Sequence, residues 1–173
     1  MAQVQVSEIP DEGLSLSFQA APAELELTAP GVRFLEPVSV DMALVKTAKA
    51  VRTTGRIRVP VIFECVRCLR EFPSSLDIPV STQFLETPPP WSLGEHPMPS
   101  EQAEDYYYRD DVLVLDDLVR QEVLLAVPFS PQCKVECRGL CSQCGQDLNM
   151  GNCACAPPPD PRWAVLREHM KGK

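Results

Sequence analysis

Eight cysteines, arranged as four close pairs, restrict the possible folds of this chain more than any other feature. The pairs are Cys65/Cys68, Cys133/Cys137, Cys141/Cys144 and Cys153/Cys155. Eight cysteines among 173 residues are fewer than the roughly 8–10% that disulfide scaffolds carry. The first residues, MAQVQVSEIPDEG, contain neither a basic nor an apolar leader region, so we expect no secretory signal and a cytoplasmic location. In a reducing compartment, such cysteines are metal ligands more often than disulfides.

The spacing of the pairs predicts two closed metal sites. Zinc takes four ligands in a tetrahedron, and a short-spaced pair supplies two of them from one turn. The last two pairs are local and close a small loop at little entropic cost, which leaves the first two pairs to join each other across the chain. We therefore predict two Zn²⁺ ions, one held by Cys65, Cys68, Cys133 and Cys137 and the other by Cys141, Cys144, Cys153 and Cys155. Disulfide or redox chemistry, buried thiols, or one site with a spare set of cysteines are the alternatives.

Up to about residue 86, apolar and polar residues alternate, which is typical of half-buried strands with one wet face. The alternating runs are Leu14 to Phe18, Leu25 to Leu27, Val38 to Leu44, Ile57 to Phe63 and Leu76 to Phe84. We expect an antiparallel, meander-like sheet. Thr53-Thr54-Gly55 predicts a hairpin turn between a strand ending near Arg52 and one beginning at Arg56. Pro60 predicts an edge position or a bulge in its strand.

The rest of the chain predicts one packed helix and a small cysteine-rich module. An acidic, proline-rich loop is expected at about 87–111. A helix is expected at about 115–127, with acids at its start and Pro128 beyond its end. Its predicted packing face is Leu115, Leu118, Val119, Leu125 and Ala126. Asp160-Pro161 is expected to open a short last helix carrying Trp163, Leu166 and Met170.

These elements together indicate an α+β fold. We expect an antiparallel β-sheet domain with one packed helix over residues 1–137. A four-cysteine zinc knuckle and a short C-terminal helix are expected over residues 138–173.

Charge is distributed unevenly along a chain whose net charge is −8. Residues 46–70 carry a local charge of +6, and residues 87–126 carry −7. Arg52, Arg56 and Arg58 share one parity and are therefore candidates for binding RNA backbone from one sheet face. The alternative for these three is an ordinary solvated strand face. The cations next to the cysteines are expected to offset the charge of zinc held by four thiolates; they are Arg67, Arg70, Lys134 and Arg138.

The sequence contains few of the residue patterns that are typical of an active site. The two histidines, His96 and His169, have no spacing that makes a triad or an open zinc site. Four thiolates close the coordination shell of zinc, whereas a catalytic zinc keeps a position for water. The acids at 101–117 are expected to form a solvated loop and a helix start. We therefore expect a protein that is not an enzyme, with metal-dependent nuclease activity on rRNA precursors as the enzymatic alternative.

The chain resembles the YceD family, the large ribosomal RNA subunit accumulation proteins of bacteria. The residues that carry this resemblance follow one another over nearly the whole chain: Glu64 to Cys68, Leu125 to Pro128, Cys133, Cys137 to Cys141, Cys144-Gly145, Asp147 to Asn149 and Asp160 to Trp163. Some family members lack the second cysteine cluster. The resemblance therefore implies that the first tetrad is the shared one and the second a stabilising element.

The resemblance implies a role in the synthesis, processing or stability of large-subunit (23S) rRNA, with no defined enzymatic activity. The implied partners are that rRNA or its precursors, ribosomal proteins or assembly factors, with neither a membrane nor a small-molecule substrate. Direct RNA binding and a protein bridge to a basic partner remain alternatives at this point. A zinc-stabilised protein adaptor or chaperone for a basic partner outside the ribosome pathway is the other function class.

Overall fold

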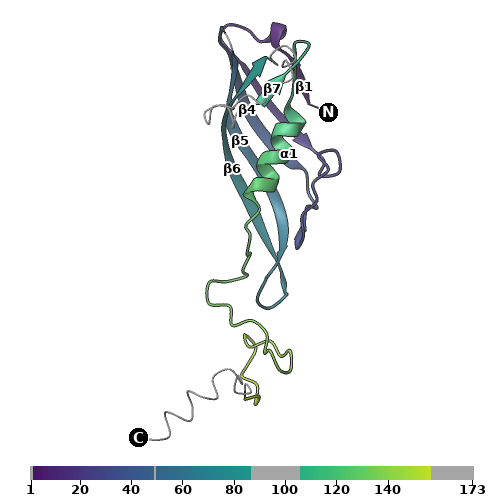
Figure 1. Cartoon of the computed structure of the whole chain (residues 1–173), viewed down its shortest axis with the longest axis vertical. Coiled ribbons are helices and arrows are strands. Elements are labelled where there is room, and N and C mark those ends of the chain that lie inside the picture. Colours follow the sequence, from purple (N-terminus) through teal and green to yellow (C-terminus); the bar gives the residue numbers. More distant parts are fainter. Residues whose placement is uncertain (1, 49, 87–105, 157–173) are drawn as a thin grey trace, which may run out of the picture.

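One long, twisted sheet forms the body of the protein (Figure 1). The computed structural model describes residues 2–48, 50–86 and 106–156. The strands of the sheet are β2 (Leu14–Ala20), β3 (Val32–Arg33), β4 (Val38–Lys46), β5 (Ala50–Glu64), β6 (Glu71–Glu86) and β7 (Tyr106–Tyr108). Their spatial order is β2-β4-β5-β6-β7, and β3 also pairs with β5. The predicted α+β class is confirmed, with antiparallel pairs throughout except for the parallel pair β6–β7.

Several predictions fall outside the described residues. They concern the proline-rich loop as far as residue 105, both histidines, and the C-terminal helix with Trp163, Leu166 and Met170. The division into two units at residues 137/138 likewise stays a prediction.

The alternation of side chains gives the sheet one buried and one wet face. In β4, Val38, Val40, Met42 and Leu44 are buried, while the residues between them are half-buried or exposed. The same period continues through β5, whose odd-numbered residues face the core. Because each apolar residue buried in this way contributes on the order of 1.5–3 kcal/mol, the two-residue period fixes which face of each strand is covered.

Helix α1 (Leu115–Ala126) covers the buried face (Figure 1). It packs through Leu115, Leu118, Val119 and Val123, all of which are fully buried. The predicted contact through Leu125 is wrong, since this side chain is 80% exposed. Val123 follows Val119 by four residues and stays over the sheet, whereas Leu125 lies about 200° further around the helix axis. No helix in the described ranges is long and apolar enough to cross a membrane.

The N-terminal segment is tied to the start of this helix. Strand β1 (Gln3–Gln5) pairs with β8 (Val112–Val114) in a separate two-stranded sheet. The 3₁₀ turn η1 (Val6–Glu8) follows, and Val6 is buried. The backbone N–H of Ala2 donates to both carboxylate oxygens of Asp116, at 3.0 and 3.1 Å. An acid in the first turn of α1 thus serves as a tether as well as a favourable charge for the helix dipole.

The predicted hairpin turn at Thr53-Thr54-Gly55 is wrong, because these residues lie inside the uninterrupted strand β5. Gly55 pairs with Met42 of β4. A Cβ added at Gly55 would lie 2.2 Å from the Asp41 carbonyl oxygen and 2.8 Å from the Met42 Cα. The absence of a side chain at Gly55 therefore allows β4 and β5 to approach closely. Such an approach is a common reason for glycine in a strand, as is a bulge or a tight bend.

Pro60 lies on β5, which is an interior strand rather than an edge. On one side of β5, pairing with β4 extends as far as Arg58, and pairing with β3 starts at Ile62. Pro60 falls in the gap between these two ladders while its other side pairs with Ser75 of β6. The prediction of an edge strand is therefore wrong for β5. The proline does occupy a local break in one ladder, where its missing N–H removes no hydrogen bond to β4 or β3.

Leu25 and Leu27 are buried, but the strand predicted around them is wrong. The segment is a turn in which the N–H of Leu25 donates to the Ala21 carbonyl and the N–H of Leu27 to the Pro22 carbonyl. Alternation over only four residues does not distinguish a strand from a turn that buries two leucines.

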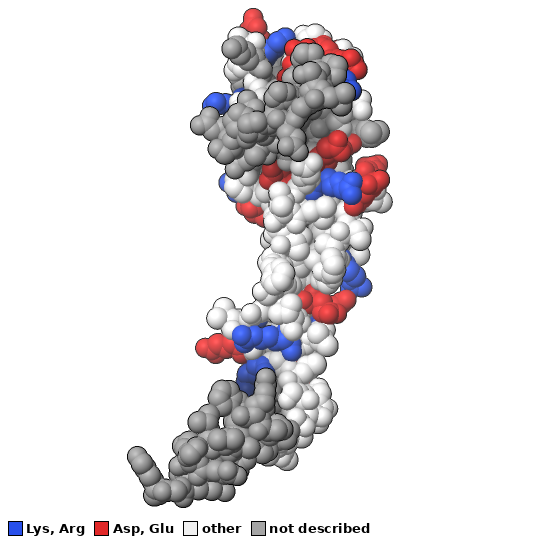
Figure 2. Space-filling model, in the orientation of Figure 1, with Lys and Arg blue, Asp and Glu red and all other residues white. Residues whose placement is uncertain are grey.

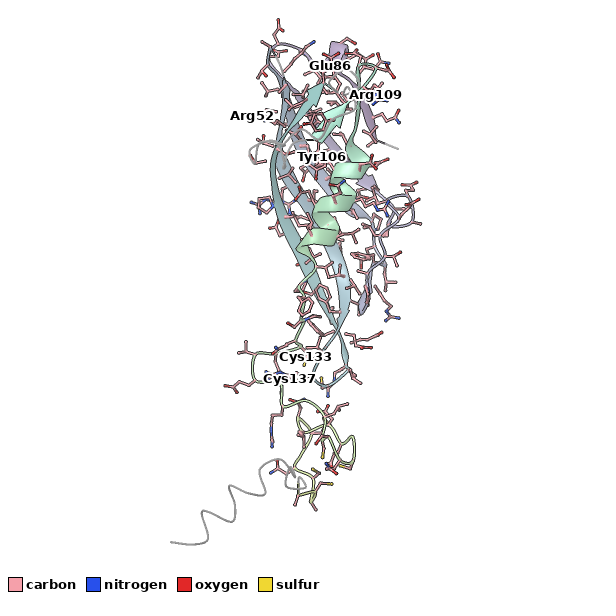
Figure 3. The ribbon with its side chains drawn as sticks, viewed as in Figure 1. Arg52, Glu86, Tyr106, Arg109, Cys133 and Cys137 are labelled. Atoms are coloured by element: carbon pink, nitrogen blue, oxygen red, sulfur yellow. The ribbon has the colours of Figure 1, made fainter. Side chains whose placement is uncertain are left out.

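Strand β7 and the turn after it occupy the end of the segment predicted to be a loop up to residue 111. The ring of Tyr106 packs against Phe84 of β6, with ring centroids 5.5 Å apart. Its hydroxyl donates to a carboxylate oxygen of Glu122 in α1 at 3.4 Å (Figure 3). Pairing β7 parallel to β6 requires a crossover of a dozen or more residues, and residues 87–105 supply that length.

Replacing Gly55 with alanine tests the close approach of β4 and β5. Because the new Cβ would overlap backbone atoms of Asp41 and Met42, we expect the free energy of unfolding to fall by about 1–3 kcal/mol or more. Denaturant titration followed by circular dichroism measures this change. Gly151→Ala is the matched control, since its added Cβ meets nothing within 4 Å and should change stability by less than about 0.5 kcal/mol. Equal stability of Gly55→Ala and the parent would contradict the close approach.

Candidate metal centres

The first cysteine tetrad joins the end of the β5–β6 hairpin to the segment that follows α1 (Figure 3). Its members are Cys65, Cys68, Cys133 and Cys137, whose sulfur atoms all lie within 4.8 Å of one another. Cys65, Cys68 and Cys137 are buried, with 0%, 7% and 1% exposure. Phe72 and Leu140 pack around them. This is the grouping that the sequence spacing predicts.

The distances within this tetrad match those of a tetrahedral metal site. The sulfur atoms of Cys65 and Cys137 are 3.8 Å apart, and those of Cys68 and Cys133 are 3.7 Å apart. Four sulfurs placed about 2.3 Å from a central zinc ion are separated by about 3.8 Å along each edge of the tetrahedron. A disulfide would need about 2.05 Å. The donor set and its spacing therefore fit a zinc ion, and the four cysteines are positioned to bind one.

A tight turn presents the first two ligands. The N–H of Cys65 donates to the Arg70 carbonyl at 2.9 Å, and the N–H of Leu69 donates to the Cys65 carbonyl at 2.8 Å. Leu69 takes a left-handed conformation, with φ of 56°. The N–H of Val66 donates to the Pro131 carbonyl at 3.0 Å, so the turn is held against the segment that carries the other two ligands.

The second tetrad is smaller and more exposed. Its members are Cys141, Cys144, Cys153 and Cys155, and their sulfur atoms also lie within 4.8 Å of one another. The N–H of Gln143 donates to the Cys141 sulfur at 3.4 Å, and the N–H of Gly145 donates to the Cys141 carbonyl at 2.9 Å. Gly145, directly after the second cysteine of this pair, has φ of +72°, a left-handed geometry that glycine adopts without steric cost. Cys144 and Cys155 are exposed, in contrast to the buried first tetrad.

The thiols of each tetrad have pKa values that split in opposite directions. Burial acts to raise the pKa of Cys65, but backbone groups of Cys133, Cys68 and Arg67 outweigh it and lower that pKa to about 6. Burial and the Cys68 thiol raise the pKa of Cys133 to about 12. Thiolates this close repel one another and cannot all ionise without a cation. A bound metal ion supplies that cation and deprotonates all four ligands.

The second tetrad repeats this electrostatic pattern. Backbone N–H groups of Cys144 and Gln143 lower the pKa of Cys141 to about 6. The neighbouring Cys144 thiol, followed by burial, raises the pKa of Cys155 to about 12. Each tetrad therefore combines thiols of lowered pKa, which lose their protons first, with thiols of raised pKa.

A network of backbone hydrogen bonds connects the two tetrads. The N–H of Leu140 donates to the Arg67 carbonyl at 3.1 Å, and the N–H of Leu148 donates to the Gly139 carbonyl at 2.9 Å. Leu140 and Asp147 form an isolated antiparallel bridge. Gly139 has φ of +72°, and a Cβ there would lie 2.9 Å from the Arg67 carbonyl oxygen. The segment between the tetrads is therefore pressed against the first cysteine turn.

Three of the flanking cations are held by specific oxygen atoms. Arg67 donates to the Cys137 carbonyl at 2.8 Å, and Arg138 donates to the Asn152 amide oxygen at 2.6 Å. Arg70 forms an ion pair with Asp147 at 2.7 Å. Sequence reasoning missed the role of Asp147 and of Asn149, whose amide contacts the Cys137 sulfur at 3.4 Å. An Asp-x-Asn step beside a cysteine pair, which favours a local side-chain-to-backbone turn, was the available signal.

The arginines predicted to bind RNA lie on the wet face of β5, along one strand rather than across a hairpin. Arg52, Arg56 and Arg58 are all exposed (Arg52 is labelled in Figure 3). Arg56 pairs with Asp77 of β6 at 2.7 Å, and Arg58 pairs with Asp41 of β4 at 3.2 Å. Two of the three charges are therefore balanced by neighbouring strands, and RNA binding by this set stays a prediction.

Some acids of the negatively charged segment also have structural partners. A carboxylate oxygen of Asp111 accepts the backbone N–H of Ser7 at 3.1 Å, and hydrogen bonds from Ser7 hold the pKa of Asp111 below its usual range. Acidic and basic side chains are interspersed on the face shown in Figure 2, and the middle of the molecule carries few of either. The acids at 95, 101, 104 and 105 lie outside the described residues.

Alanine at Gly139 tests the contact between the two tetrads. Both Gly139 and Gly145 have φ of +72°, but only at Gly139 would a Cβ meet the Arg67 carbonyl oxygen. A left-handed alanine costs about 1–2 kcal/mol at either position, and the overlap should add at least about 1 kcal/mol more at Gly139. Urea unfolding of Gly139→Ala and Gly145→Ala measures the difference. Equal losses of stability in the two variants would contradict the close contact.

Comparison with known proteins connects this geometry to a family. The model of the family described as large ribosomal RNA subunit accumulation protein YceD matches residues 53–168. Uncharacterized proteins of Mycobacterium bovis and Mycobacterium tuberculosis are 30% identical over 131 residues, covering 76% of this chain and 61% of each relative. One of Mycobacterium leprae is 26% identical over 132 residues, covering 76% of this chain and 58% of the relative.

The chain thus spans about six tenths of the length of the curated relatives it matches. No solved structure matches it significantly. The matched residues 53–168 include every cysteine of both tetrads and helix α1, which lies between the two halves of the first tetrad in the chain. On the strength of that match, which extends over more than half of the sequence and confirms the resemblance carried by its motifs, the chain belongs to the YceD family.

Proposed function

We propose that this protein is a non-enzymatic factor for the synthesis, processing or stability of large-subunit (23S) rRNA during ribosome assembly in the cytoplasm. The observation that carries this proposal is the family match, whose description names accumulation of the large ribosomal RNA subunit. The partners on this proposal are large-subunit rRNA or its precursors, ribosomal proteins or assembly factors. The tetrads support binding rather than catalysis, because four cysteine ligands leave no coordination position for a reacting group.

Zinc in both tetrads is the second part of the proposal. The sulfur spacing of 3.7–3.8 Å in the first tetrad and the all-thiol donor sets support it, since thiolate ligands in a tetrahedral arrangement suit zinc. The metal in this role is structural. It links the β5–β6 hairpin to the chain after α1, in addition to the hydrogen bonds between Val66 and Pro131 and between Arg67 and Cys137.

We infer that the link to rRNA runs through a basic protein rather than through direct contact with the RNA backbone. The net charge of −8 opposes binding to phosphates. Arg56 and Arg58 already have carboxylate partners, so a phosphate would have to displace them. An acidic protein instead attracts a cationic partner, and complementary charge speeds and orients such an encounter.

Metal analysis of the purified protein tests the structural part. Protein prepared without chelator should contain about two zinc ions per chain. Cys68→Ser should lose one ion and Cys144→Ser the other, because each removes one ligand from a different tetrad. Elemental analysis of the parent and both variants measures the stoichiometry. If both variants lost the same ion, the assignment of cysteines to two separate sites would be wrong.

Affinity capture from growing cells tests the biological part. The tagged protein, isolated at low salt, should enrich large-subunit rRNA precursors and large-subunit proteins, identified by sequencing and mass spectrometry. If a protein partner provides the contact, that partner should remain bound after RNase treatment. A clean absence of ribosomal material would overturn the proposed function and favour an adaptor outside the ribosome pathway.

The three exposed arginines of β5, Arg52, Arg56 and Arg58, allow direct RNA contact to be tested in the same capture experiment. With a protein bridge, Arg52→Ala/Arg56→Ala/Arg58→Ala should capture as much rRNA as the parent. Arg120→Ala is the control for loss of an exposed, ion-paired arginine, since Arg120 lies on α1, away from the wet face of β5, and pairs with Glu26 at 2.9 Å. A selective loss of rRNA from the triple variant, with steep salt dependence, would show direct RNA contact instead.

A further inference from the structure

One side chain from the loop of the second tetrad contacts a ligand of the first. Asn149 lies between Cys144 and Cys153, and its amide nitrogen lies 3.4 Å from the sulfur of Cys137. An N–H donated to a ligand sulfur stabilises negative charge on that sulfur and orients it, as partners in the outer shell of metal sites commonly do. The first tetrad therefore includes an outer partner that belongs to the second tetrad in the chain.

The orientation of the Asn149 amide is fixed at both ends. Its oxygen accepts the backbone N–H of Arg138 at 3.0 Å. Its nitrogen also donates to a carboxylate oxygen of Asp147 at 2.7 Å, and the same oxygen accepts the Asn149 backbone N–H at 2.8 Å. With every polar atom engaged, the amide cannot turn away from Cys137 without breaking several hydrogen bonds.

The loop that carries Asn149 is closed by the second tetrad. Residues 145–152 run from Cys144 to Cys153, and none of them is in a helix or a named strand. Bringing Cys144 and Cys153 together around one ion closes this loop, at an entropic cost that the ligand bonds offset. The ion pair from Arg70 to Asp147 then holds the closed loop against the first cysteine turn.

We propose that metal binding at the second tetrad positions the amide of Asn149 on Cys137 and so tightens metal binding at the first tetrad. This inference rests on the proposed metal binding of both tetrads. Asn149 is a positioning residue that acts through Cys137. Because coupling between two binding sites is reciprocal, metal at the first tetrad strengthens binding at the second by the same factor.

Two sets of variants separate this coupling from a purely local effect. Asn149→Asp keeps an oxygen for the Arg138 N–H but loses the donor to the Cys137 sulfur and to the Asp147 carboxylate. Asn152→Asp is the matched control, because it adds the same charge in the same loop and contacts the Arg138 side chain rather than a sulfur. Cys144→Ser/Cys155→Ser disables the second tetrad at its two exposed ligands, away from the hydrophobic core.

The experiment measures cadmium affinity at each tetrad of the full chain by competition with a chelator, using ¹¹³Cd NMR to resolve the two ions. Asn149→Asp should weaken the first tetrad by about tenfold or more and shift its ¹¹³Cd signal, while Asn152→Asp changes neither. Cys144→Ser/Cys155→Ser should weaken the first tetrad similarly. Adding Asn149→Asp to that double variant should then have little further effect, as expected of a double-mutant cycle with coupled sites.

The outcomes distinguish failure of the inference from failure of the proposed sites. If the parent binds two ions and Cys144→Ser/Cys155→Ser leaves the affinity of the first tetrad unchanged, the coupling is overturned. The proposed metal sites are then still supported. An equal loss on Asn149→Asp with and without a functional second tetrad would also overturn it, because Asn149 would then act independently of that metal. A parent protein that binds no cadmium at all would instead remove the proposed metal sites.

Discussion

The first tetrad brings four sulfur atoms from two distant parts of the chain together at the cysteine end of the molecule. Cys68 and Cys133 are 65 residues apart in the chain, yet their sulfurs are 3.7 Å apart. The sheet and α1 form a conventional core, but the chain leaves that core after Val127 and forms no further helix or named strand among the residues described up to 156. The arrangement beyond the helix therefore depends on the first tetrad, and the second tetrad depends on the segment that the first one anchors.

The sequence predicted features that follow from residue type and spacing, such as the two cysteine tetrads. It did not predict features that depend on contacts between distant segments. The eight cysteines could be assigned to two tetrads because two pairs are adjacent and the other two have only each other. Gly55 was misread as a turn because a close approach of strands leaves the same residue type as a hairpin. β7 was missed because its pairing depends on Tyr106 packing on Phe84 and α1. Asn149 was missed as a sulfur contact because its partner belongs to a different cysteine pair.

The ion pairs of the sheet change how the basic stretch of this acidic protein should be interpreted. Within the +6 segment of the sequence, Arg56 and Arg58 of β5 pair with Asp77 and Asp41 on the neighbouring strands. Arg33 and Arg70 are likewise paired, with Glu71 and Asp147. Exposed pairs of this kind contribute little to stability, but they remove free positive charge from the surface. Charge counted along the sequence therefore overstates the charge that a phosphate backbone would encounter.

The length of the β5–β6 hairpin determines how far apart the two ends of the molecule lie. Fifteen residues of β5 at about 3.3 Å each span roughly 50 Å, from the end that holds β1 and β8 to the end that holds the cysteines (Figure 1). The ladder between β5 and β6 is continuous from one end to the other, so the length of these strands sets the separation of the two ends. Two macromolecules gripping opposite ends would be held apart at a set separation without touching each other, and lengthening the hairpin by two residues per strand would move them further apart by about 7 Å.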